Sequence, residues 1–425
     1  MIVLQASLCL LFAFAVFAFG AVQVWPQAII EAGAAVLLVF WSALFCRDAD
    51  AKIQWNPLNW PLLGVILIGV LQLLLHGTAY AFLTRTELLR FSAYFIIFFL
   101  LAQAFSKRTE FEGLAWFLML LCFVVSLLGI VEHFTADNQM YWMSSFSAQN
   151  DFFGPFVNRN DFAGFVELTL PTGLALAIFR GIRKELFPLV ILLTIVPVSA
   201  LILSASRAGI IGFAFELCVL AVLARIRRKE SAPKMAALGI IALAAVVLIA
   251  WVGADKAIQR FSAVSKVELT FGRRASMAHA AGKIFLDHPI KGTGLGTLGS
   301  VYPRYETLYD GLVVEHVHND YLEGLAEMGI AGGICGLVFL WLLYREARRS
   351  FTASQGHFSL ALHAGAIAAL TGLLFHSFLD FNLHIPSNAL LFLVQAFLAT
   401  SIPLPTRTRP KVKRPVGREF SAVSS

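Results

Sequence analysis

Long apolar segments recur along this chain, and they limit its fold more than any other feature. A helix that crosses a bilayer needs about 20 consecutive, mostly apolar residues. The 425 residues are 58% hydrophobic and 14% charged, with a mean hydropathy of +0.76, whereas a soluble domain is roughly 25% charged. We therefore predict an all-α, polytopic membrane protein.

Twelve segments meet the length and apolarity that a spanning helix requires. They are residues 3–22, 27–46, 59–76, 88–106, 113–133, 161–180, 186–204, 208–226, 235–253, 319–344, 358–379 and 386–403. We divide the chain accordingly into helices 1–9 (1–253), a large loop (254–318), helices 10–12 (319–403) and a basic tail (404–425) that we expect to be disordered. A second long loop runs from about 135 to 161. Loops of such length usually carry function.

The lysines and arginines predict the orientation of the chain in the membrane. Most of the 33 lie in alternate connections and in the tail, in short clusters between apolar runs. Positive residues concentrate in cytoplasmic loops, so we place both termini in the cytoplasm and the two long loops outside. The net charge of +7 therefore reflects membrane orientation and does not indicate nucleic-acid binding. No lysine or arginine precedes the first apolar segment, whereas a signal peptide begins with positively charged residues. This favours a retained helix over a signal peptide.

The large loop contains an expected amphipathic helix from Arg273 to Leu286. Apolar residues recur on one face at helical spacing, at Met277, Ala280, Ala281, Ile284 and Phe285. Asp287, His288 and Pro289 should end this helix. If Arg273 and Arg274 open it, the N-terminal amide groups beside them favour an anion, and only one of these adjacent arginines should face a site. The later Gly294–Gly299 segment matches a dinucleotide fingerprint literally but lacks the strand before it, so we interpret it as a turn.

A histidine-rich segment, Glu315 to Tyr321, joins this loop to the tenth apolar segment. His316 and His318 raise the question of a metal site, but no third ligand follows at helical spacing. We instead expect one of these two histidines to act as a general base, because an imidazole titrates near neutral pH. We predict neither a metal nor another cofactor.

Arginines and amides recur at other external helix ends. Arg207 lies in a short serine-containing turn between two apolar helices, where we expect it to bind an anion. Arg159 lies between Asn158 and Asn160, a set that suits sugar and phosphate contacts, while Asn160 or Asp161 alternatively serves as a helix N-cap. A third cluster runs from His376 past Asp380 to His384. We favour a structural network there over a role in the site.

In their order, these motifs resemble the O-antigen ligase and polymerase superfamily. The motifs are Gly154–Asn160, Ser204–Gly209, Gly272-Arg273, Asp287–Gly296, His318–Tyr321 and Glu327–Gly329. The resemblance implies a metal-independent glycosyltransferase of the bacterial inner membrane with a GT-C-like helical fold. The implied donor is a glycan on undecaprenyl diphosphate, and the acceptor is lipid A–core, another glycan or a protein. The family's essential arginines fall on Arg207 and Arg273 and its catalytic histidine on His318. The family often has tryptophan where this chain has Met277.

Together these arguments predict a site on the periplasmic face. His318 is the base, oriented by Asp320 or Glu315, and Arg207 and Arg273 bind the diphosphate in an inverting transfer. The expected substrate-binding residues are Asn158, Arg159, Asn160, Arg274, His316, Asn319, Asp320 and Tyr321. Ligation of a glycan to lipid A–core is the favoured function. Polymerisation of O-antigen or exopolysaccharide repeat units is the alternative, and transport of lipid-linked sugars is a weaker one.

Overall fold

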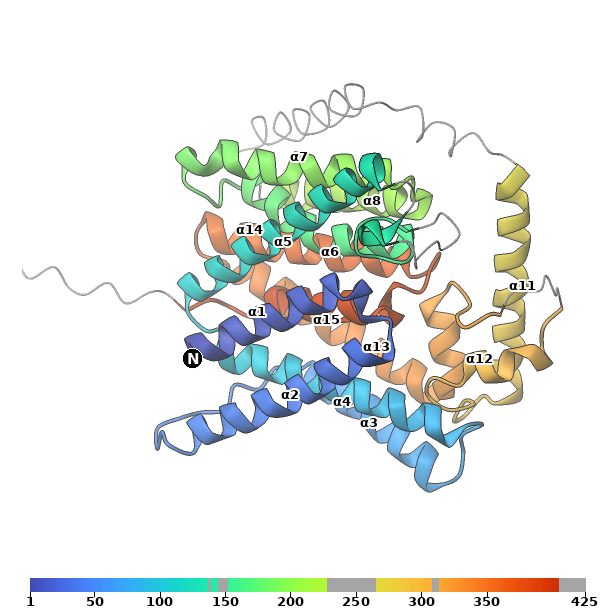
Figure 1. Ribbon diagram of the computed structural model, residues 1–425. Coiled ribbons are helices and arrows are strands. Elements are labelled where there is room, and N and C mark those ends of the chain that lie inside the picture. The colour runs from blue at the N-terminus through green and yellow to red at the C-terminus, as the bar shows by residue number, and fades with distance from the viewer. Residues whose placement is uncertain (137–138, 144–151, 228–264, 308–312, 405–425) are drawn as a thin grey trace, which may run out of the picture.

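A computed structural model describes residues 1–136, 139–143, 152–227, 265–307 and 313–404. The regular elements of these ranges are helices, and most of them run side by side as a bundle (Figure 1). Their bounds are α1 (Ile2–Phe17), α2 (Val24–Phe45), α3 (Asn59–Leu74), α4 (Ala81–Ala104), α5 (Arg108–Thr135), α6 (Arg159–Ile178), α7 (Phe187–Leu203), α8 (Arg207–Ile226), α11 (Ser265–Asp287), α12 (Leu298–Val301), α13 (Asp320–Ala353), α14 (His357–His376) and α15 (Pro386–Thr400).

Eight of the described helices are long and apolar enough to span a membrane. They are α2, α4, α5, α6, α7 with the short turn before it, α8, α13 and α14, while α1, α3 and α15 are shorter apolar helices. These elements correspond in order to the predicted spans except 235–253, which lies outside the described residues. The prediction of an all-α, polytopic membrane protein is confirmed. α13 continues to Ala353, beyond the predicted end at 344, because hydropathy marks the membrane-embedded part of a helix and not its end.

The centre of the bundle is α6, whose membrane-spanning window is wholly buried. α5, α7, α8, α14 and α15 pack around it. Small residues allow α14 to approach closely, since a Cβ on Gly365 would lie 2.9 Å from the Pro171 carbonyl oxygen of α6. Membrane helices associate mainly through such close packing, because lipid offers no hydrophobic driving force between them.

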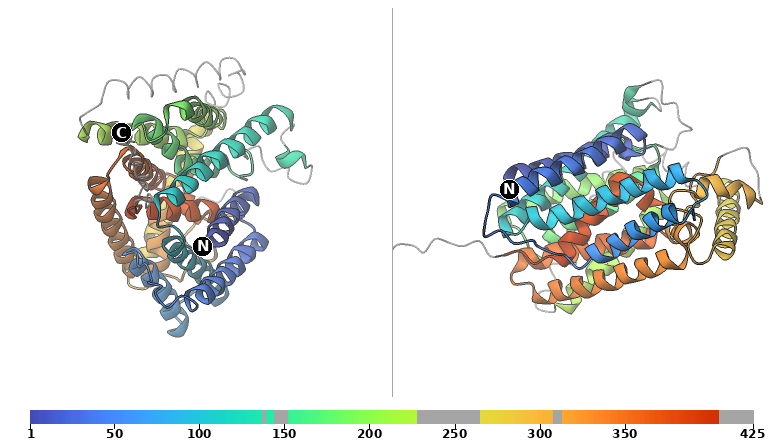
Figure 2. Two further views of the ribbon diagram at one scale, coloured as in Figure 1. Left: turned by 90° about the vertical axis from the view of Figure 1, so that its left-hand side faces the viewer. Right: turned by 90° about the horizontal axis from the view of Figure 1, so that it is seen from below.

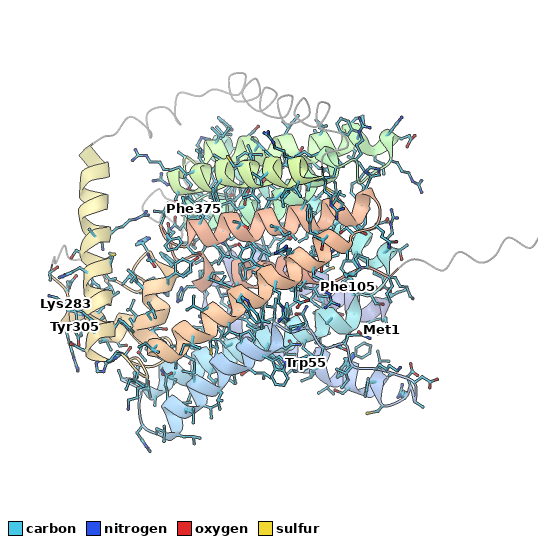
Figure 3. All side chains as sticks on the ribbon, turned by 180° about the vertical axis from the view of Figure 1, so that it is seen from behind. Met1, Trp55, Phe105, Lys283, Tyr305 and Phe375 are labelled. Atoms are coloured by element: carbon cyan, nitrogen blue, oxygen red, sulfur yellow. The ribbon has the colours of Figure 1, made fainter. Side chains whose placement is uncertain are left out.

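At one end of the bundle, which we call the site end, α11 lies across the other helices (Figures 1 and 2). Figure 3 shows Lys283 and Tyr305 at this end and Met1 and Phe105 near the other. The predicted apolar face of α11 is confirmed, because Met277, Ala280, Ala281 and Ile284 are buried against a small cluster that includes Val317 of the histidine segment.

The predicted start of this loop helix is wrong. α11 begins at Ser265, and it ends at Asp287 as expected. Arg273 and Arg274 therefore lie within the helix, where the amide groups are hydrogen-bonded along the helix. The expectation that free N-terminal amides assist these arginines fails for that reason. The amphipathic pattern indicated the packed face of the helix, not its length.

The glycine-rich segment after α11 is a turn, as predicted, and it packs against α13. Gly292, Gly294 and Gly296 have positive φ. The Glu327 carboxylate accepts hydrogen bonds from the amides of Gly296 (2.8 Å) and Leu298 (2.9 Å). A side chain of α13 thus uses amides that a phosphate would need in a nucleotide site.

α13 is interrupted at Gly329, where φ is +62° and ψ is −159°. Only glycine readily adopts this conformation. A Cβ at Gly329 would lie 2.6 Å from the carbonyl group of Ile290 in the loop. The interruption therefore lets the loop and the start of α13 pack backbone to backbone.

We predict that Gly329→Ala lowers the free energy of unfolding by roughly 2–4 kcal/mol, the sum of the backbone and overpacking costs. The measurement is the thermal midpoint of the purified protein in detergent. Gly336→Ala in the same helix is the matched control, because its Cβ would meet no atom within 4 Å and alanine favours a helix by about 0.5–1 kcal/mol. Equal midpoints for the two variants would contradict the packing argument.

Candidate functional site

The candidate site is built from five segments that are far apart in the sequence. They are the start of α6, the α7–α8 turn, α11, and two loops that flank α13 and α14 at the site end. Each supplies one or two polar side chains to a continuous hydrogen-bonded network. The network centres on the carboxylate of Asp380.

Asn158 and Asn160 place the start of α6 in this network. Asn158 is the N-cap, since its side chain accepts a hydrogen bond from the Asn160 amide at 2.9 Å. The alternative that Asn160 or Asp161 caps the helix is therefore wrong. The Asn160 side chain is free to bridge two other segments. It donates to Asp380 Oδ2 at 2.6 Å and accepts from the Ser206 hydroxyl at 2.8 Å.

Ser206 connects the α7–α8 turn to the network. Its hydroxyl accepts a hydrogen bond from the Gly209 amide at 3.2 Å and so caps α8. Ala205 before it has a positive φ of 54°, which turns the chain sharply between the two helices. Arg207, the first residue of α8, is exposed beside this cap.

Asp380 lies in the connection after α14, and its side chain is only 1% exposed. Its Oδ1 is 2.7 Å from His318 Nδ1, and its Oδ2 is 3.4 Å from Arg274 Nη2. Burial alone would raise the pKa of this carboxyl group. The hydrogen bond and charge of His318 and the charge of Arg274 outweigh burial and lower the pKa to about 2. Asp380 is therefore an anion at neutral pH.

His318 is held in a defined orientation by this carboxylate. Its backbone is left-handed (φ 51°), and the ring edge contacts Phe381 at a centroid distance of 4.9 Å. A carboxylate on Nδ1 selects the tautomer that carries the proton there. Nε2 then keeps its lone pair and is able to accept a proton. The same division of roles between acid and imidazole occurs in hydrolase triads.

The structure brings several predicted residues to this network. Asn160 and Arg274 touch Asp380, as His318 does. Arg159 and Arg273 are their sequence neighbours on the same helices, and Arg207 follows Ser206. Arg273 points about 100° away from Arg274 around α11. It is Arg274 that reaches Asp380.

The other predicted residues lie beside the network. Asn319 caps α13, accepting hydrogen bonds from the amides of Tyr321 (3.1 Å) and Leu322 (3.0 Å). The Tyr321 hydroxyl donates to the Leu374 carbonyl oxygen of α14. These contacts fix where the tenth predicted span begins relative to α14.

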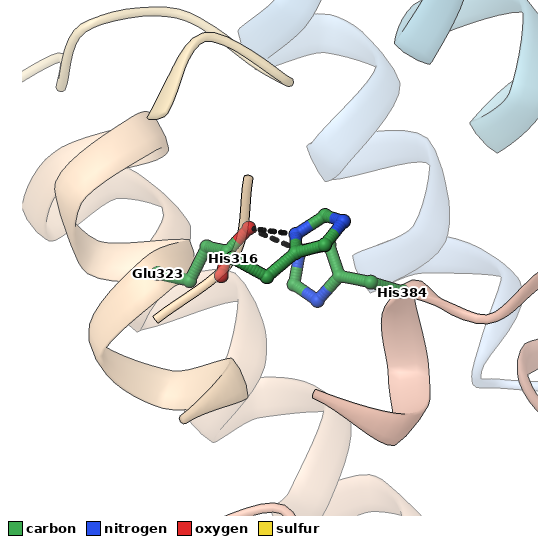
Figure 4. A group of neighbouring side chains, drawn as sticks. All are labelled: His316, Glu323 and His384. Carbon is green, nitrogen blue, oxygen red and sulfur yellow. Dashed lines mark hydrogen bonds and ion pairs between the residues drawn. The ribbon is translucent and has the colours of Figure 1, made fainter. Parts of the chain in front are cut away.

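Asp320 and His316 belong to a second cluster next to His318. Asp320 accepts a hydrogen bond from His384 Nδ1 at 2.7 Å, and His316 Nδ1 lies 2.6 Å from Glu323 Oε1 (Figure 4). Glu315 is exposed. The expectation that Asp320 or Glu315 orients His318 is wrong, because the carboxylate on His318 belongs to Asp380.

We predicted one structural network for the segment from His376 to His384, but its residues have different partners. His376 hydrogen-bonds Glu167 at 3.1 Å, and both side chains are fully buried between α14 and α6. This part is the structural pair we favoured. Asp380, four residues later, instead holds His318, and His384 holds Asp320 and Glu323. The density of acids and imidazoles on the predicted external side was the available signal.

Fold and site together define a polytopic membrane protein with a histidine–carboxylate pair and arginines at one end of its helices. Residues 189–337, about a third of the chain, match the family model described as O-antigen ligase. This match confirms the predicted relation to the O-antigen ligase and polymerase superfamily, a family of glycosyltransferase-type enzymes. The matched region includes Arg207, Arg273 and His318. No curated protein matches the chain.

The depressed pKa of Asp380 predicts how pH affects stability. An unfolded aspartate titrates near 3.9, so the ionised Asp380 stabilises the fold above about pH 4, and this contribution disappears as pH falls towards 2. Asp380→Asn removes this contribution and should lower the free energy of unfolding at pH 7 by up to about 2 kcal/mol. The difference from wild type should shrink as pH falls from 4 to 2. Thermal midpoints across this range provide the measurement. A constant difference would contradict the assignment.

Proposed function

We propose that the protein transfers a glycan from undecaprenyl diphosphate to an acceptor hydroxyl at the site end. The observation that carries the proposal is the 2.7 Å contact between His318 and Asp380. Arg274 of α11 reaches the same carboxylate, and Arg159 and Arg207 begin α6 and α8 next to the network residues Asn160 and Ser206. A base alone suits many reactions. A base next to several arginines suits transfer from a diphosphate, whose leaving group carries negative charge.

In this mechanism His318 Nε2 takes the proton of the acceptor hydroxyl as its oxygen attacks C1 of the donor sugar. The bond from C1 to the phosphate oxygen breaks, and undecaprenyl diphosphate leaves with the electron pair. Arg207 and Arg273 bind this diphosphate, while Arg274, on another side of α11, stays paired with Asp380. Guanidinium groups pair with phosphate oxygens bidentately and need no metal. Attack in line with the leaving group inverts the anomeric carbon. Asp380 stabilises the imidazolium that forms.

Asn158, Arg159, Asn160, Arg274 and the polar residues near His318 complete the proposed substrate-binding surface. Asn160 and Arg274 are held by Asp380, so the same carboxylate that orients the base also positions groups for sugar or phosphate. His316, Asn319, Asp320 and Tyr321 shape the neighbouring wall through their contacts with Glu323, α14 and His384.

We place the site on the periplasmic face of the bacterial inner membrane, with both termini in the cytoplasm. The distribution of basic residues supports this orientation. The described helix ends that point away from the site carry Arg180 after α6, Arg227 after α8 and Arg345–Arg349 in α13. Positive residues are enriched on the cytoplasmic side. Lipid-linked glycans presented from outside would then meet the site end directly.

The favoured acceptor is lipid A–core, which makes the protein a ligase, and the alternative is a polymerase that joins repeat units. Purified protein supplied with lipid-linked repeats alone separates the two. A ligase should leave the repeats unextended until lipid A–core is added, whereas polymer formed without lipid A–core identifies a polymerase. Transfer should persist in EDTA. Movement of the lipid-linked sugar across vesicles without any transfer would favour a transporter.

We predict that His318→Ala lowers the turnover number by at least about 10²-fold, the usual contribution of a general base. Arg207→Ala should lower it by roughly 10²–10³-fold through lost charge stabilisation. Both variants should keep the wild-type thermal midpoint within a few degrees and still bind the lipid donor. The exposed His288 at the end of α11 offers a matched control, and His288→Ala should retain full activity. Full activity in His318→Ala would overturn the assignment of the base.

A further inference from the structure

Beside the proposed catalytic pair, a second group of side chains has the composition of a metal site. His316, Glu323 and His384 come from three segments of the chain, and one donor atom from each lies within 4.8 Å of the other two. Figure 4 shows both imidazole rings directed at the Glu323 carboxylate. We infer that these three residues bind a divalent transition-metal ion such as Zn²⁺.

The distances suit a metal ion after a small adjustment. Donor atoms at 2.0–2.1 Å from a tetrahedral Zn²⁺ lie roughly 3.3 Å apart. His384 Nε2 is already 3.3 Å from Glu323 Oε1, and His316 Nδ1 is 2.6 Å from the same oxygen. His316 therefore has to retreat from this oxygen by under about 1 Å, and the two ligating nitrogens already lie within 4.8 Å of each other. Its side chain is partly exposed, so the loop has room for this movement.

The surroundings of His384 favour the tautomer that a metal requires. Asp320 Oδ1 lies 2.7 Å from His384 Nδ1, so this carboxylate holds the Nδ1–H and leaves Nε2, 3.3 Å from Glu323 Oε1, as the nitrogen that would bind an ion. Metal-binding histidines commonly donate their second N–H to a carboxylate in this way. The Glu323 carboxylate is held too, because its Oε2 accepts the Val317 amide at 3.1 Å. Two imidazoles and a glutamate are also a common zinc ligand set.

The ion would join the two segments that carry the proposed catalytic pair. His316 lies two residues before His318, and His384 lies four residues after Asp380. Phe381 is stacked on the His316 ring at a centroid distance of 4.8 Å and also contacts His318. The ion thus stabilises the relative placement of these segments.

The test is Zn²⁺ binding by the full-length, EDTA-treated protein in detergent, measured by competition with a chromogenic chelator. The cysteines are alkylated beforehand to remove thiol ligands. One equivalent should bind saturably, and His384→Gln or Glu323→Gln should weaken this site at least about 100-fold. Asp320→Asn should weaken it by about 10–100-fold, the usual effect of losing a histidine's carboxylate partner. His288→Gln, on the exposed end of α11, should bind as wild type does.

Two further measurements keep the proposal falsifiable if a variant folds poorly. Zn²⁺ should raise the thermal midpoint of wild type but not of His316→Gln, whose side chain lies on the partly exposed loop. Co²⁺ in the same site should give the visible absorption of a four- or five-coordinate ion. Absence of a saturable equivalent, or equal affinity in wild type and His384→Gln, would overturn the site. Neither measurement uses transfer activity, so this result stands apart from the proposed function.

Discussion

The buried carboxylate of Asp380 is the interaction on which the site end depends. A buried charge is costly unless it is paired and hydrogen-bonded, and this one obtains its partners from three other segments. His318 comes from the histidine loop, Asn160 from α6 and Arg274 from α11. Separating any one of these segments would remove one of the groups that compensate the charge. One side chain therefore couples the placement of the large loop to the position of the central helix.

A second buried carboxylate, Glu327, fixes the other side of the same loop. It binds backbone amides of the glycine-rich turn, while Gln72 of α3 donates to the carbonyl groups of Lys291 and Glu327. The loop is thus attached to the bundle by polar groups at its glycine-rich turn and at its histidine segment, and the apolar face of α11 adds to this attachment. This arrangement explains why a long external segment packs as part of the fold. It also shows why a literal glycine motif carried no information about nucleotides.

The sequence predicted the spans well because the thickness of a bilayer sets a length that apolar runs must meet. The order of short motifs assigned functional roles to Arg207, Arg273 and His318, and these roles stay predictions. It did not predict the role of Asp380, which lies 62 residues beyond His318 and meets it only after α13 and α14 fold back on each other. The start of α11 was missed for a related reason. Periodicity identifies residues that pack against a partner, and a helix can extend past its partner.

The positions of the arginines add an electrostatic argument for an anionic substrate. Arg159 and Arg207 are the first residues of α6 and α8, directly after their caps Asn158 and Ser206. A helix N-terminus carries a partial positive charge of about half a unit, so each guanidinium group adds to a field that already favours anions. Asn160 links these two helix starts through Ser206, which fixes their separation. Because helices rather than flexible loops hold these charges, little reorganisation is needed as negative charge develops on a leaving diphosphate. Under the proposed function, the bundle therefore contributes to catalysis through the rigid placement of its helix ends.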